Sequence, residues 1–463
     1  MSIEQTSLGI TIMPDYAQSE GVDAVLENIV DRLGCTVLCT TPSVAEPCPE
    51  GSGVREPPAD AGAGLGRTLD RPLWGNTALW MRTAASFRPD PALYRDSLYS
   101  PPLAEPLTDR EGGTVARLLA GAKRAGMSVQ LQLMAAAPPG LRVQCRDDDT
   151  GEQPLTIYGK PVPGRVDANV SLASQGLRRY MRALVIDLLA NYPDCDALRF
   201  DWPEYPPYAP DSLLFDFSPA AVKRGQELGH DVEAIRARAL EGVQALSRRF
   251  AAAPEAVDFE ALLAQGSWAA ELLAFRAAIV GDYVRDLTAI VRDVSGGRVG
   301  VVMQAFPPPM NRLSGFDFAG IDGVADEVAV KHYTMHWPMI ERNYVERLAQ
   351  LTGVDADAAF AGVHRWLGLN GNASTRDGLR YPEPDEPHPA GDDELRRAVE
   401  SAAGELRQSR FSTIVHGYGP LDDVERRFRA VLESPCRHLH LNRYGYLSDE
   451  KIARLGVIWR ANR

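Results

Sequence analysis

Eight short apolar runs alternate with stretches of helical periodicity along the whole chain, and this alternation restricts the possible folds more than any other feature. The first two runs flank a stretch with apolar residues at helical spacing, residues 22–33, which predicts a parallel strand-helix-strand unit with a right-handed crossover. No glycine-rich phosphate loop follows the first run. The pattern therefore predicts an α/β (β/α)₈ TIM barrel rather than a doubly wound sheet. The eight predicted strands are 7–14, 35–39, 128–134, 197–200, 300–306, 328–333, 412–418 and 438–444.

Two long segments enlarge the predicted barrel. Residues 45–108 are rich in proline, glycine and charge, and we expect a long insertion after the second strand, with one extra strand near 78–82. Residues 218–295 contain two long helical stretches, so the crossover after the fourth strand is enlarged. We expect one barrel domain over residues 1–463, and the alternative is that either segment folds as a separate subdomain.

The composition excludes several classes of partner. The net charge of -13 and the isoelectric point near 5.2 argue against nucleic acid and anionic membranes. The sequence has neither a leader-like N-terminus nor about 18 consecutive uncharged apolar residues, so we expect a soluble, cytoplasmic protein. Its six cysteines form no CxxC pair, which argues against a disulfide framework. A homo-oligomer remains open.

The segment 194–208 is the most informative for function. Its apolar run, Ala197–Phe200, ends in carboxylates, aromatic rings and prolines. Prolines at 203, 206 and 207 cannot donate to a sheet, so the strand must end near Trp202. Asp201 and Glu204 then lie at the rim of the barrel, where two carboxylates beside flat apolar rings suit acid/base chemistry on a sugar. An ion pair with Arg199 or Arg165 is the structural alternative.

The other strands also end in polar or aromatic residues, and a TIM barrel places its site at these ends. Alternation along the sixth strand allows Lys331 and Tyr333, or else His332, to face inward. We expect no metal site, because Trp337-Pro338 makes a helix through His332 and His336 improbable. The predicted substrate contacts are Asp15, Tyr16, Gln132, Arg199, Trp202, Tyr205, Gln304, Lys331, His332, Tyr333, His416, Asn442 and Arg443.

Residues 196–206, Asp-Ala-Leu-Arg-Phe-Asp-Trp-Pro-Glu-Tyr-Pro, resemble the fourth-strand signature of chitinase-like glycoside hydrolases. This resemblance implies that Asp201 is a supporting aspartate and Glu204 the general acid. Arg199 replaces an aspartate of that signature, and Pro203 is inserted before the glutamate.

The tripeptide Arg199-Phe200-Asp201 also resembles the α-amylase-like barrels, which implies that Asp201 is a nucleophile. Gln304 and Gly417 stand where those enzymes carry a second and a third carboxylate. The chain therefore resembles the broad group of barrel glycoside hydrolases without matching either pattern fully.

We expect a glycoside hydrolase-like enzyme that uses Asp201 and Glu204 for catalysis, binds a carbohydrate or glycoside and needs no cofactor. One alternative is a sugar isomerase, epimerase or lyase, in which Lys331 or His332 transfers a proton, with or without a divalent metal. A second alternative is a non-catalytic carbohydrate-binding barrel.

Overall fold

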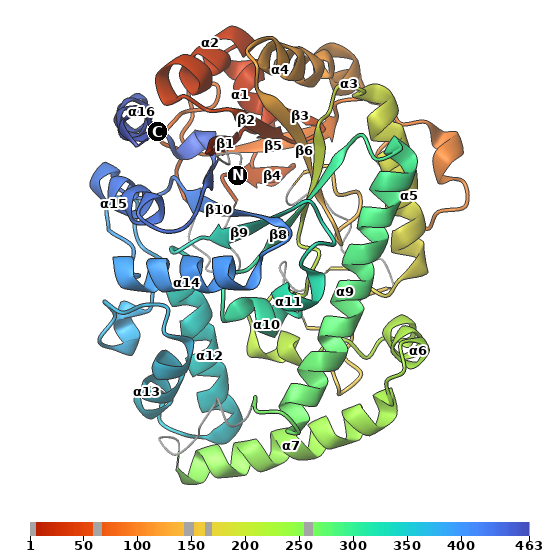
Figure 1. The fold of residues 1–463 in the computed structure, drawn as a ribbon, viewed down its shortest axis with the longest axis vertical. Coiled ribbons are helices and arrows are strands. Elements are labelled where there is room, and N and C mark those ends of the chain that lie inside the picture. The colour runs from red at the N-terminus through yellow and green to blue at the C-terminus, as the bar shows by residue number, and fades with distance from the viewer. Residues whose placement is uncertain (1–5, 59–66, 143–151, 163–168, 254–262, 463) are drawn as a thin grey trace.

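The computed structural model describes residues 6–58, 67–142, 152–162, 169–253 and 263–462. Eight parallel strands close into a barrel in the order β1-β11-β10-β9-β8-β7-β6-β2, with helices around it (Figure 1). The predicted (β/α)₈ fold is confirmed. The barrel strands are β1 (Ser7–Thr11), β2 (Val37–Thr40), β6 (Ser128–Met134), β7 (Ala197–Asp201), β8 (Gly300–Ala305), β9 (Glu327–His332), β10 (Arg410–His416) and β11 (His438–Asn442).

Helices connect successive strands of the barrel. The stretch predicted at 22–33 begins as an α-helix and continues as a π-helix. Among the described residues, no helix combines the length and the apolarity needed to cross a membrane. The principal helices are α2 (Val22–Leu26), η1 (Glu27–Leu33), α4 (Gly113–Arg124), α5 (Gln175–Asn191), α6 (Pro219–Glu227), α7 (Val232–Ala252), α9 (Trp268–Ser295), α12 (Trp337–Thr352), α14 (Asp392–Glu405), α15 (Leu421–Leu432) and α16 (Asp449–Ala461).

Alternate residues of each strand point into the barrel. Four of these, Ala197, Val302, Ala329 and Ile414, form a small apolar cluster separate from the main core, which lies between the strands and the helices. The imidazole of His440 fills the space beside β1. A Cβ atom placed on Gly9 would lie 2.2 Å from its Nδ1 atom, so this position requires glycine.

Residues 45–108 contain more regular structure than we expected. β3 (Ser43–Cys48), β5 (Leu79–Ala85) and β4 (Val54–Glu56) form a three-stranded antiparallel sheet in that order. The extra strand predicted near 78–82 is part of β5. β3 and β4 escape the pattern analysis because β4 is only three residues long and β3 contains a proline.

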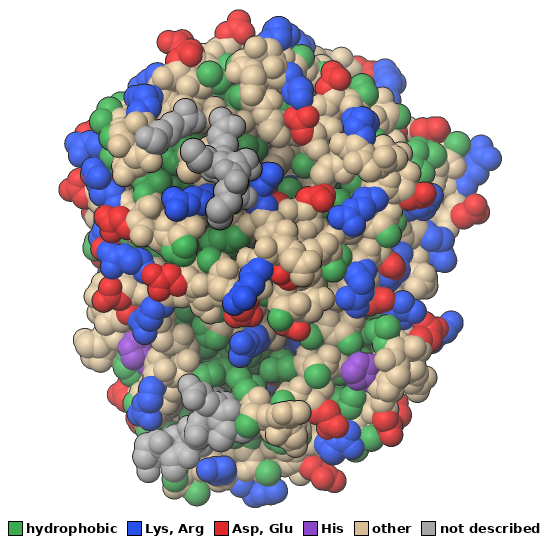
Figure 2. Space-filling view, viewed as in Figure 1, with side chains coloured by type: hydrophobic (Ala, Val, Ile, Leu, Met, Phe, Trp, Pro, Cys, Tyr) green, Lys and Arg blue, Asp and Glu red, His purple; other side chains and the backbone are tan. Residues whose placement is uncertain are grey.

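In the described part of the segment after β7, the longer helices are α6, α7 and α9. α9 runs alongside the barrel and extends beyond it (Figure 1). α7 crosses the end of α9 that lies away from the barrel, and it packs against both α9 and α12. Apolar residues of α7, α9, α12, η3 (Pro210–Leu214) and α13 (Ala356–Leu367) line a cavity. Apolar side chains gather in a hollow in the lower half of Figure 2. The sequence analysis did not predict the helix α13.

Candidate active site

The candidate site begins where β7 ends. Asp201 is the last residue of the strand, and Trp202 has a φ of 59°, in the left-handed region that residues with a side chain rarely adopt. Such a conformation costs of the order of 1–3 kcal/mol and persists only where the surroundings impose it. The strand thus ends where the prolines predicted, and the turn brings Glu204 back beside Asp201.

The ammonium group of Lys331 lies between the two carboxylates. Its Nζ is 3.1 Å from Oδ1 of Asp201 and 3.5 Å from Oε1 of Glu204. The same atom lies over the rings of Trp202 and Phe306, 5.2 and 4.4 Å from their centroids. One lysine from the sixth barrel strand therefore joins both predicted carboxylates in one place, inside an aromatic clamp.

Glu204 is completely buried and fully hydrogen-bonded. Its Oε2 accepts a bond of 2.6 Å from the hydroxyl of Ser314, and its Oε1 accepts one of 3.1 Å from the backbone N–H of Phe306. Burial raises the pKa of Glu204 to about 7, although Lys331 and Ser314 act to lower it. A carboxyl with this pKa exchanges its proton near neutral pH.

Arg199 does not pair with Asp201, and Arg165, the other partner considered above, lies outside the described residues. It lies inside the barrel, with Nη2 3.3 Å from Nδ1 of His440 and 3.9 Å from Oε1 of Glu327. The amide of Gln304 donates a bond of 2.9 Å to Gln132. These polar side chains lie on the inner face of their strands. Gln132 is paired in register with Arg199, two residues before Asp201 on β7.

Tyr333 and His416 lie at the inner ends of β9 and β10. Tyr333 packs against the apolar cluster inside the barrel. Its ring and the ring of His416 meet edge to face, with their centroids 5.2 Å apart. The Nη1 atom of Arg67 lies 3.4 Å from Nε2 of His416, and its guanidinium lies over the ring of Tyr446. Tyr333 and His416 therefore lie together at the carboxyl ends of the barrel strands.

An aromatic pair extends the site beyond Asp201. The rings of Trp202 and Tyr208 are stacked, with an interplanar angle of 3° and centroids 5.9 Å apart. The hydroxyl of Tyr208 lies 2.6 Å from Nδ1 of His336. Trp202 is only partly buried, so part of its indole remains accessible to a ligand.

Two predicted contacts near the N-terminus are engaged elsewhere. Asp15 is fully buried and forms two hydrogen bonds, of 2.8 and 3.1 Å, with the guanidinium of Arg142. The hydroxyl of Tyr16 donates to the carbonyl of Arg71. These residues begin α1 (Pro14–Ser19), and their hydrogen-bonding groups hold the surrounding loops together.

Tyr205 and His332 also point away from the two carboxylates. The hydroxyl of Tyr205 donates a bond of 2.8 Å to Asp216. His332 is buried on the outer side of β9, where it contacts the ring of Trp337 and the backbone of Ala398. Burial lowers the pKa of His332 to about 4. The alternation rule was right that His332 and Lys331 lie on opposite sides, and we place only Lys331 in the site.

The last barrel strand brings two further predicted residues to the rim. Asn442 is the final residue of β11, on the same side as His440. Arg443 follows it, forms an ion pair with Glu56 and lies over the ring of Tyr446. Glu56 also accepts a bond from Arg142, so residues after β11 and residues of β4 meet at this part of the rim.

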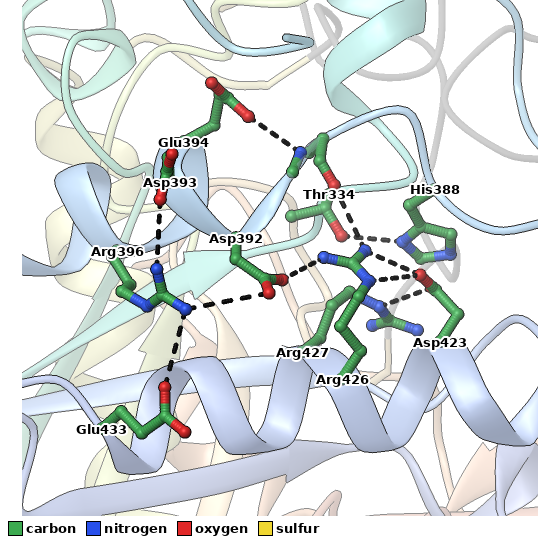
Figure 3. A network of polar contacts seen from close by, with 12 residues as sticks. Thr334, His388, Asp392, Asp393, Glu394, Arg396, Asp423, Arg426, Arg427 and Glu433 are labelled. Atoms are coloured by element: carbon green, nitrogen blue, oxygen red, sulfur yellow. Dashed lines mark hydrogen bonds and ion pairs between the residues drawn. The ribbon is translucent and has the colours of Figure 1, made fainter. Parts of the chain in front are cut away.

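A polar network fixes the ends of β9 and β10 (Figure 3). The hydroxyl of Thr334, just after β9, lies 2.7 Å from Nδ1 of His388. Arg427 of α15 pairs with Asp423 and donates bonds of 2.6 Å to the carbonyls of His416 and Tyr418. The network thereby holds His416 in place from behind the strand.

Three residues of the site were not predicted: Phe306, Ser314 and Arg67. Phe306 is the last residue of the predicted strand 300–306 and directly follows the observed β8, so its position could have indicated a site residue. Ser314 and Arg67 are distant in sequence from every predicted strand end. Across the described ranges, no three or more His, Cys, Asp or Glu side chains are grouped so that they could hold a metal ion.

The fold and the site define a closed (β/α)₈ barrel with an acidic pair and a lysine at the carboxyl ends of its strands. No known family model matches the sequence, and no curated protein matches it. A likeness to solved barrel structures is found, and those cited below are glycoside hydrolases.

Three of these structures show how low the sequence identity and the TM-score of these matches are. A β-galactosidase from the psychrophilic Marinomonas ef1 has a TM-score of 0.49 and 12% identity, over 98% of this chain and 59% of its own, so this chain spans about three fifths of that enzyme. The catalytic domain of β-amylase from Paenibacillus polymyxa has a TM-score of 0.48 and 10% identity, over 96% and 94%. Ostrinia furnacalis Group IV chitinase has a TM-score of 0.44 and 8% identity, over 98% and 100%. All three scores are below 0.5, so they assign neither substrate nor mechanism to this chain.

Proposed function

We propose that this protein hydrolyses a glycosidic bond and that Asp201 and Glu204 are its catalytic pair. The observation that carries the proposal is the shared contact of both carboxylates with Lys331, at the end of the barrel where TIM-barrel enzymes have their active sites. The accessible part of Trp202, stacked on Tyr208, provides a flat apolar surface beside them for a sugar ring.

The environments of the two carboxylates support different roles. Glu204 has a pKa of about 7 and holds a proton for much of the time at neutral pH, which suits the general acid. Asp201 accepts a hydrogen bond of 3.1 Å from Nζ of Lys331 and ends the strand at the barrel rim, a position that suits the nucleophile. Glu204 thus protonates the leaving-group oxygen, and Asp201 attacks the anomeric carbon.

The separation of the carboxylates supports retention of configuration. Oδ1 of Asp201 and Oε1 of Glu204 lie 3.1 and 3.5 Å from the same nitrogen, so their separation is at most the sum of these distances. Inverting enzymes keep their carboxyl groups about 6.5–9.5 Å apart, whereas retaining enzymes keep them about 5–5.5 Å apart. The two oxygens could be as far apart as in an inverting enzyme only if both lay almost in line with Nζ, on opposite sides of it.

The proposed reaction has two steps. Asp201 forms an ester with the anomeric carbon as the bond to the leaving oxygen breaks, and that oxygen takes the proton of Glu204. The ionised Glu204 then removes a proton from a water molecule, the water oxygen bonds to the anomeric carbon, and the ester to Asp201 breaks. The enzyme returns to its starting protonation state.

A panel of aryl glycosides tests the proposal, with Asp201→Asn, Glu204→Gln and the control Asp196→Asn. Asp196 lies just before the same strand but pairs with Lys123 at the surface. We expect activity of the wild type and of Asp196→Asn, and losses of at least ~10²–10⁴-fold in the other two variants. An active wild type whose activity survives both Asp201→Asn and Glu204→Gln would refute the assignment.

The buried Lys331 amine favours one second candidate, a sugar isomerase, epimerase or lyase. In such an enzyme Lys331 or a neighbouring carboxylate would move a proton next to a sugar carbonyl. NMR of free aldoses and ketoses incubated with the wild-type protein distinguishes the two. Conversion of a free sugar that Lys331→Met abolishes would favour this second candidate over hydrolysis.

A further inference from the structure

We propose that Ser314 is a positioning residue that keeps Glu204 hydrogen-bonded in both of its protonation states, by turning one hydroxyl proton between two acceptors. This inference rests on the proposed function, because it gives Glu204 the role of an acid that loses and regains a proton. Its geometric basis is independent of any substrate.

Ser314 is the last residue of the short helix α10 (Met310–Ser314) and is fully buried. Its Oγ lies 2.6 Å from Oε2 of Glu204 and 2.8 Å from the backbone carbonyl of Asn311. The backbone N–H of Phe316 points to the same Oγ at 3.3 Å. A serine hydroxyl has a single proton, so it can donate to only one of the two acceptors at a time.

Each position of the hydroxyl proton matches one state of Glu204. When Glu204 is ionised, the hydroxyl donates to Oε2 and stabilises the negative charge. When Glu204 is protonated on Oε2, the carboxyl donates to the serine oxygen, and the hydroxyl turns to the carbonyl of Asn311. That carbonyl already accepts from Phe316 N–H and has a second lone pair. Neither state leaves a buried polar group without a partner, which would cost about 1–3 kcal/mol.

The other oxygen of Glu204 is fixed in both states. Oε1 accepts from the backbone N–H of Phe306, which cannot turn, and lies near Lys331. We therefore place the exchangeable proton of Glu204 on Oε2, the oxygen beside Ser314. The barrel wall holds the carboxyl in position while its charge changes.

Few charged groups face this carboxyl. Lys331 from β9 and Asp201 from β7 act on it. From α9, Arg276 is directed to the carbonyl of Ser212 and lies over the ring of Tyr205. On α10 itself, Arg312 is exposed and lies 3.9 Å from Glu405. Removal of the Ser314 hydroxyl therefore changes the environment of Glu204 without changing any of these charges.

Carboxyl ¹³C NMR of protein labelled at glutamate tests the inference without any substrate, and Glu204→Gln assigns the signal. We expect Ser314→Ala to raise the midpoint of the Glu204 titration by about one pH unit, a tenfold change in its ionisation constant, and Ser314→Thr to restore it. Ser212→Ala is the matched control, because its buried hydroxyl donates to the carbonyls of Pro206 and Ala209 and, within the described residues, contacts no carboxylate. A midpoint that is unchanged or lowered in Ser314→Ala would overturn the inference.

A second measurement uses the wild type alone, in case Ser314→Ala does not fold. The infrared difference spectrum across the Glu204 titration, assigned with Glu204→Gln, should show the C=O band of a carboxyl that donates a hydrogen bond. A band of a free carboxyl would overturn the inference. Since neither measurement needs turnover, a midpoint shift in a protein that cleaves no glycoside would contradict the proposed function and support the role of Ser314.

Discussion

At the scale of single residues, the site depends on how one lysine and two acids share a buried space. Lys331 is 3% exposed and the side chain of Glu204 is 0% exposed, so water screens their interaction little. Sequence analysis found all three residues because each ends a predicted strand or follows one. It did not pair them, because the contact joins the fourth and sixth barrel strands, which are 130 residues apart.

Replacing Lys331 by methionine should destabilise the fold and raise the pKa of Glu204 above about 7. The substitution leaves two buried carboxylates without their shared cation, and breaking a buried pair in this way costs roughly 3–5 kcal/mol. Urea unfolding at pH 7 measures the change. Lys123→Met is the control, because Lys123 pairs with Asp196 at the surface, at 2.8 Å, and should cost at most about 1 kcal/mol. Equal effects of the two substitutions would contradict a buried role for Lys331.

The pKa of Glu204 also predicts a pH dependence of stability. Its value of about 7 in the folded protein lies above the ordinary 4.5, so folding favours the protonated form. This contribution is fully present below pH ~4.5 and is lost as the pH rises through about 7. Glu204→Gln keeps a neutral side chain, so its stability relative to the wild type should increase over this range, by up to roughly 3 kcal/mol. Thermal unfolding of both proteins from pH 4.5 to 8 measures this, and a constant difference would contradict it.

At the scale of elements, the barrel strands were predictable because each is a short apolar run that ends in proline or polar residues. β4 was missed because three residues cannot show a period. Missing β4 affected the prediction of the site, because Arg142 bonds both to Glu56 of β4 and to Asp15. Asp15 looked available for a substrate only because this partner sheet was not foreseen.

Because β1 packs closely on β11, a single methyl group added at Gly9 should lower the stability of the fold. In Gly9→Ala the new Cβ would lie 2.2 Å from Nδ1 of His440, whose other nitrogen, Nε2, is 2.9 Å from the Thr11 hydroxyl. We expect a loss of about 1–3 kcal/mol by denaturant unfolding, as for other overpacked cores. Gly404→Ala in α14 is the control, because a Cβ there meets no atom within 4 Å and should be neutral or stabilising by up to ~1 kcal/mol. A harmless Gly9→Ala would contradict the described packing.

At the scale of the whole molecule, closure of the barrel brings the ends of strands that are far apart in the sequence into one place. Lys331, Tyr333 and His416 come together at the mouth because parallel strands all end on the same side. The sequence could not tell which polar residues face that mouth and which fix the surrounding loops. That choice depends on distant partners, such as Asp216 for Tyr205, which no local pattern encodes.

The measurement that tests the catalytic pair most directly is covalent trapping. Aryl 2-deoxy-2-fluoroglycosides of whichever sugar the wild type cleaves slow the second step of a retaining reaction and leave the sugar on the nucleophile. Mass spectrometry of the digested protein should then find one sugar per chain, attached to Asp201. A sugar attached to a different carboxylate, or an active enzyme that inverts the anomeric configuration and never becomes labelled, would contradict the proposed mechanism.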